Sequence, residues 1–108
     1  MLFVNLMTLK PGLSREQINE AAQRRARWKY PPELKLVAEY WVQGTPNIIA
    51  IIEADHAGEI LQAIYAWNDA FDIQTHPALS VEDGLRALQK AGIVRRRGRR
   101  PKSLRGPV

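Results

Sequence analysis

Cysteine is absent from this chain of 108 residues, which excludes a disulfide framework and a thiolate metal site. Proteins of reducing compartments are typically free of disulfides, so we expect a cytoplasmic location. No apolar run approaches the roughly 20 residues that a membrane-spanning helix needs, so we expect no membrane contact. The opening segment, MLFVNLMTLK, lacks a basic stretch and a cleavage site, and it is interpreted as a strand rather than a signal peptide.

Negative charge is missing after Val94. The residues beyond it hold seven Lys or Arg and no Asp or Glu, whereas the residues up to Val94 hold nine Lys or Arg against eleven Asp or Glu. We therefore predict one domain, 1–94, and a basic tail, 95–108. Such a tail favours nonspecific contact with phosphate by counterion release, although it has no aromatic side chain to stack on bases. The alternative is that it only adds solubility or contacts an acidic partner or the acidic domain.

The apolar pattern predicts an α+β fold. Apolar stretches bounded by Gly, Pro and Asn predict strands at 2–9, 34–43, 48–53 and 71–79. Helical spacing predicts one helix that starts at Ser14, a second with Asp55 as its N-cap, and a short third that begins at Ser80 and stops at Gly92. The order β-α-β-β-α-β with a C-terminal helix is the ferredoxin-like arrangement, in which both crossover helices cover one face of the sheet.

The other face of that sheet is expected to be apolar. We expect Leu2, Val4 and Leu6 to face the helices, which leaves the alternate residues of each strand on the open face. That set comprises Phe3, Asn5, Met7, Val37, Glu39, Trp41, Asp72, Gln74 and His76. An apolar face of this size is unfavourable in water. We therefore predict a homodimer in which two sheets pack as a barrel about a two-fold axis.

Polar residues within that open face form the candidate site. Glu39 is the candidate base and His76 the candidate acid or orienting group, because a carboxylate and an imidazole in an apolar cleft can carry out proton transfer. The candidate ligand-binding residues are Asn5, Trp41, Asp72 and Gln74. The alternative is that these are polar groups of an interface or a solvated rim. His56 and His76 match no compact metal-ligand spacing, so we predict neither a metal nor a cofactor.

Three short motifs carry a family resemblance that covers about residues 1–90. Glu53-Ala54-Asp55, Trp67-Asn68-Asp69 and the segment Asp72 to Pro77 resemble a family of short bacterial and archaeal domains of unknown function. More distantly, the Met-Leu-Phe start, the strand Val37-Ala38-Glu39-Tyr40 and the same Asp72 segment resemble muconolactone isomerase. Ala38 and His76 depart from that pattern. Both resemblances imply a dimeric α+β barrel, and the second also implies rings of dimers and cofactor-free proton transfer.

Two classes of function follow from these features. The first is a homodimeric barrel that binds a small organic molecule in a cleft, with proton transfer of the isomerase type as its candidate chemistry. The second is a non-catalytic binding or assembly module whose basic tail contacts nucleic acid or an acidic partner. The residues do not decide whether the protein is an enzyme.

Overall fold

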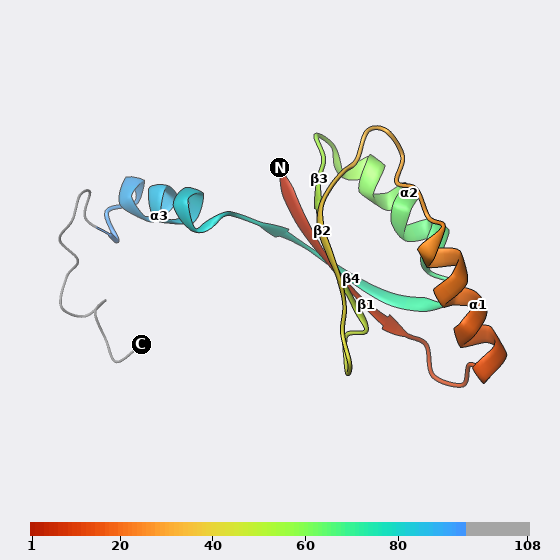
Figure 1. The fold of residues 1–108 in the computed structure, drawn as a ribbon. Coiled ribbons are helices and arrows are strands. Elements are labelled where there is room, and N and C mark those ends of the chain that lie inside the picture. Colours follow the sequence, from red (N-terminus) through yellow and green to blue (C-terminus); the bar gives the residue numbers. More distant parts are fainter. Residues whose placement is uncertain (95–108) are drawn as a thin grey trace. The chain divides into compact units, whose positions relative to one another are not determined.

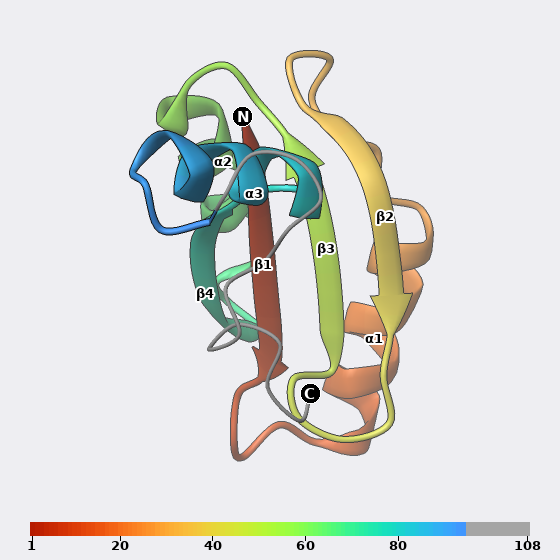
Figure 2. The ribbon, with the colours of Figure 1, turned by 90° about the vertical axis from the view of Figure 1, so that its left-hand side faces the viewer.

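Within residues 1–94, which the computed structural model describes, four strands form one antiparallel sheet in the order β2-β3-β1-β4 (Figure 2). The strands are β1 (Leu2–Leu9), β2 (Lys35–Trp41), β3 (Ile48–Glu53) and β4 (Phe71–Ala78). Because β1 and β2 are both antiparallel to β3, they run parallel to each other with β3 between them. This is the split βαβ connection of the ferredoxin-like fold, and the predicted fold class is confirmed.

Two helices connect the strands and cover the same face of the sheet (Figure 1). Helix α1 (Arg15–Ala26) follows Ser14, whose hydroxyl accepts from the Gln17 N–H while the Gln17 side chain accepts from the Ser14 N–H. This capping box confirms the predicted helix start. Helix α2 (Ala57–Trp67) begins after His56, so the prediction of Asp55 as N-cap is wrong. The extended chain continues past β3, because the Ala54 N–H still donates to the Met1 carbonyl.

The chain forms two compact units, and the sheet with its two helices makes up the first, Met1–Ala78. The second unit begins at Leu79 and includes α3 (Val81–Lys90). The Ser80 hydroxyl accepts from the Asp83 N–H and caps this helix, as the sequence indicates. The predicted basic tail, 95–108, lies outside the described residues.

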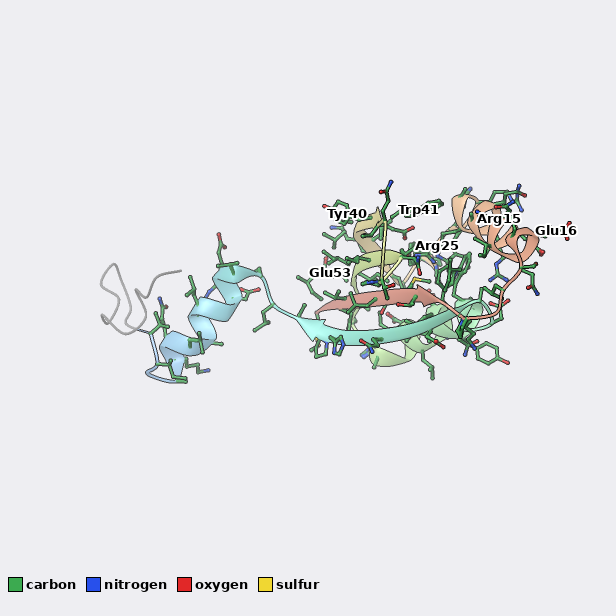
Figure 3. All side chains as sticks on the ribbon, turned by 90° about the horizontal axis from the view of Figure 1, so that it is seen from below. Arg15, Glu16, Arg25, Tyr40, Trp41 and Glu53 are labelled. Carbon is green, nitrogen blue, oxygen red and sulfur yellow. The ribbon has the colours of Figure 1, made fainter. Side chains whose placement is uncertain are left out.

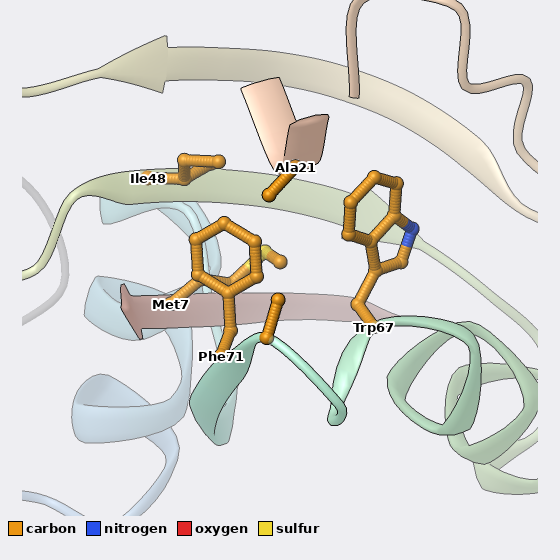
Figure 4. Packing of buried hydrophobic residues seen from close by; sticks show 6 residues of the cluster. Met7, Ala21, Ile48, Trp67 and Phe71 are labelled. Atoms are coloured by element: carbon orange, nitrogen blue, oxygen red, sulfur yellow. The ribbon is translucent and has the colours of Figure 1, made fainter. Parts of the chain in front are cut away.

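The core of the first unit lies between the sheet and its helices. Figure 4 shows one of its clusters, in which Met7, Ile48 and Phe71 of the strands pack with Ala21 and Trp67 of the helices. A second cluster surrounds Ala50 and Ile52, which are fully buried. Burial of these apolar side chains is the main force that holds the helices on the sheet.

Strand β1 presents the opposite face to the one we expect from its sequence. Phe3, Asn5 and Met7 face the helices, since they pair with Ile52, Ala50 and Ile48 of the core. Leu2, Val4 and Leu6 therefore lie on the open face. The strand is apolar at nearly every position, so its sequence does not indicate which of its two faces points to the helices. The packing of the strands that pair with β1 decides which face points to the helices.

Replacing Met7 tests this assignment. Met7→Ala should lower the free energy of unfolding by about 2 to 5 kcal/mol, because Met7 is 2% exposed and its removal leaves a cavity. Thr8→Ala, the adjacent position on the open face, should change it by less than about 0.5 kcal/mol. Urea unfolding followed by circular dichroism measures both. Equal losses in the two variants would contradict the assignment.

Candidate functional site

The most highly connected polar group described is the carboxylate of Glu39 in β2. It accepts hydrogen bonds from Arg25 of α1, with Nε at 3.1 Å and Nη2 at 2.5 Å. The Tyr30 hydroxyl donates to it at 2.8 Å and the Trp41 indole N–H at 2.9 Å. Figure 3 shows Arg25 between α1 and the strands, while Arg15 and Glu16 lie at the far end of the helix. These bonds join α1 to β2.

Arg25 is a cation in an almost closed environment. Its side chain is 3% exposed and that of Glu39 is 16% exposed. The guanidinium carbon also lies 4.9 Å from the Trp67 ring centroid and 5.4 Å from that of Tyr30. A buried cation is tolerated only where an anion and hydrogen bonds compensate it. Glu39 supplies the anion, and the aromatic faces add cation–π attraction.

The network shifts the pKa values of both of its acids. Burial alone would raise the pKa of Glu39, but hydrogen bonds from Arg25, Trp41 and Tyr30 and the charge of Arg25 outweigh it, so the pKa is lowered. Burial raises the pKa of the Tyr30 hydroxyl, and the neighbouring Glu39 carboxylate adds to the effect. At neutral pH the site therefore holds a carboxylate, a guanidinium and a neutral phenol.

A cavity of about 180 Å³ opens between α1 and the sheet, with Arg25 in its wall. Helix α1 contributes apolar side chains, and β1, the β2–β3 hairpin and β4 contribute the rest. The lining residues are Leu9, Ile18, Ala21, Ala22, Arg25, Trp41, Val42, Asn47, Ile48 and Phe71. Asn47 is already engaged, because its Oδ1 accepts from the Leu9 N–H at 2.7 Å and its Nδ2 donates to the Gly44 carbonyl. The pocket is thus mainly apolar.

The residues of the predicted site do not share one face. Glu39 and Trp41 lie on the helix side with Arg25. Asn5 is buried on the same side and accepts from the Thr75 hydroxyl at 2.7 Å. Asp72, Gln74 and His76 pair with Thr8, Leu6 and Val4, which places them on the open face as expected. The expectation that Glu39 and His76 meet on one face of a single chain is therefore wrong.

A β-bulge explains the error in β2. Leu36 pairs with Ile52 and faces the helices, as we expect, but Ala38 pairs with Ile51, so Val37 is an extra residue. One extra residue reverses the alternation beyond it. Glu39 and Trp41 consequently turn to the helix side, while Ala38 and Tyr40 turn to the open face.

Arg25 is the functional candidate that the sequence analysis missed. It follows Ile18 and Ala21 at helical spacing, which places it on the buried stripe of α1. A charged residue on such a stripe indicates a buried ion pair, and this signal could have identified Arg25 from the sequence. The neighbouring Arg24, which is half-buried against Trp67, and the exposed Arg27 obscured this signal.

Two further kinds of feature concern metal binding and membrane crossing. Among residues 1–94, no three or more His, Cys, Asp or Glu side chains are grouped so that they could hold a metal ion. Over the same residues, no helix combines the length and the apolar character needed to cross a membrane.

The fold and the pocket define a class, namely a small α+β domain with a cavity between the first helix and the sheet. The chain belongs to the family described as Domain of unknown function (DUF3303), whose model matches residues 1–92. The predicted membership in a family of unknown function is confirmed, whereas the resemblance to muconolactone isomerase is not shown. No curated protein and no solved structure gives a significant match to the chain.

Glu39→Gln should lower the free energy of unfolding by about 2 to 4 kcal/mol near pH 7, because it leaves the buried Arg25 without its anion. The lowered pKa of Glu39 contributes stability that is fully present above 4.5, the ordinary value, and is lost as pH falls through the folded-state pKa. The difference between wild type and variant should therefore shrink at about pH 3. Urea unfolding at both pH values measures it, and a difference that does not change with pH would contradict the assignment.

Proposed function

We propose that this protein is a homodimeric binding module for a small organic molecule, and that the pocket beside Arg25 is its binding site. The observation that carries the proposal is the pocket itself, which has apolar walls and a charge-compensated arginine. Ligand sites are typically concave and mainly apolar, with few polar groups. An engineered apolar cavity of about 150 Å³ in another protein binds benzene, so a volume of about 180 Å³ suits a molecule of one ring.

The open face of the sheet supports the dimer. Its apolar side chains come from three strands and are only partly covered within one chain: Leu2, Val4, Leu6, Ala38, Ile49 and Ile51. Tyr40 and Val37 at the edge are 59% and 52% exposed. A continuous apolar face favours association, and a two-fold axis lets this face of one chain pack against the same face of a second chain. The predicted dimer thus has support from a different set of residues than the sequence suggested.

The geometry favours binding over proton transfer. Glu39 accepts four hydrogen bonds, which makes its carboxylate a weak base. His76 lies on the opposite face of the sheet, so the proposed acid and base are separated within one chain. The alternative function, in which the basic tail contacts nucleic acid or an acidic partner, depends on residues 95–108 and their seven positive charges.

Filling the pocket tests the binding site. Ala22 lines the pocket from α1, so the larger side chain of Ala22→Leu should occupy the space and abolish binding of small aromatic probes such as toluene. Ala66→Leu is the matched control, because Ala66 is exposed on α2 and does not line this pocket. Ligand-observed NMR measures binding in the full chain. Equal binding by wild type and Ala22→Leu would overturn the assignment of the site.

Sedimentation velocity tests the dimer. The wild-type chain should sediment as a dimer or a larger assembly at micromolar concentration, and Ile51→Lys should yield monomers, because a lysine in the apolar face would be buried without a partner. Leu61→Lys on α2 makes the same change at a side chain that is 64% exposed, and it should leave the assembly unchanged. A monomeric wild type would refute the proposed interface.

A further inference from the structure

The wall of the pocket carries no uncompensated charge. Among residues 1–94, Arg25 is the only ionisable residue whose side chain lines the pocket, and Glu39 neutralises it directly. Nε and Nη2 of Arg25 donate to Glu39, and Nη2 also donates to the Tyr30 hydroxyl. The Glu39 carboxylate also accepts hydrogen bonds from the Tyr30 hydroxyl and the Trp41 indole N–H. An incoming anion would gain little net attraction from Arg25, because the Glu39 carboxylate already offsets the charge of the guanidinium.

A charged ligand would therefore lose its hydration without gaining a counter-ion. The other polar residue of the lining, Asn47, uses both ends of its amide, one with Leu9 at the end of β1 and the other with Gly44 in the hairpin. The remaining walls are apolar, and two of them, Trp41 and Phe71, are aromatic. Aromatic walls favour a ring through edge-to-face and offset contacts, whereas an apolar wall disfavours a bare charge.

We infer that the pocket takes an uncharged molecule with a single aromatic ring, and that Glu39 sets this preference by neutralising Arg25. The inference rests on the proposed binding function and adds the class of ligand. Glu39 acts here as a specificity-determining residue, since it contacts the arginine of the wall. Glu39 also accepts a hydrogen bond from the indole N–H of Trp41, a residue of the pocket wall, with Nε1 and Oε2 2.9 Å apart.

Three probes of matched shape and different charge test the inference: benzamide, benzoate and benzamidine. In titration calorimetry with the full chain, benzamide should bind about tenfold or more tightly than benzoate or benzamidine, because only the charged probes lose hydration without compensation. Ala22→Leu should abolish the binding of benzamide, which locates it in the pocket.

Removing the anion should change the preference. In Glu39→Gln the positive charge of Arg25 is no longer neutralised, so benzoate should become the tightest of the three probes. Asp69→Asn is the matched control. It removes the carboxylate that pairs with the adjacent Arg24 at 2.9 Å, outside this pocket, and should leave the order of the probes unchanged.

The outcomes separate the inference from the function on which it rests. Tighter binding of benzoate than of benzamide by the wild-type protein, abolished by Ala22→Leu, would overturn the neutral class and leave the pocket as a binding site. Binding of no probe, or binding that Ala22→Leu leaves intact, would overturn both. The wild-type comparison decides the ligand class even if Glu39→Gln fails to fold.

Discussion

The ion pair between Arg25 and Glu39 is the constraint on which the site depends. It links the last turn of α1 to β2, and it brings Tyr30 and Trp41 to the same carboxylate. An arginine on the buried face of a helix is unfavourable without this partner. The position of Glu39 therefore fixes how α1 lies over the edge of the sheet, and the pocket is the apolar space that remains beside the pair.

One extra residue in β2 makes this pair feasible. Without the bulge at Val37, Glu39 would point to the open face, and the buried Arg25 would lack its anion. With it, the carboxylate and the indole of Trp41 turn to the helix side, while Tyr40 joins the open face. A single irregularity thus assigns polar groups to the helix side and apolar groups to the proposed dimer interface. Strand β2 therefore contributes side chains both to the pocket and to the proposed dimer interface.

The sequence predicted the order of the elements well, because local signals determine it. The strands β1 and β3 have the predicted bounds, and the Ser14 and Ser80 caps are where the pattern of Ser and Gln or Asp places them. The candidate site was predicted only in part. Asp72, Gln74 and His76 lie on the expected face, whereas Asn5, Glu39 and Trp41 lie on the other. No local pattern marks the bulge in β2, because Leu36, Val37 and Ala38 are all apolar and either alternation fits them.

The sequence by itself determined the α+β order, the helix caps and the family, since capping, turn residues and apolar periodicity act over a few residues. Only the tertiary structure decided which face each strand presents, and hence that Glu39 meets Arg25 rather than His76. That choice depends on pairing between strands, both strands far apart in the chain, as for Met7 with Ile48, and strands joined by a hairpin, as for Glu39 with Ala50. Such pairings are set by packing across the whole sheet, which no short stretch of sequence contains.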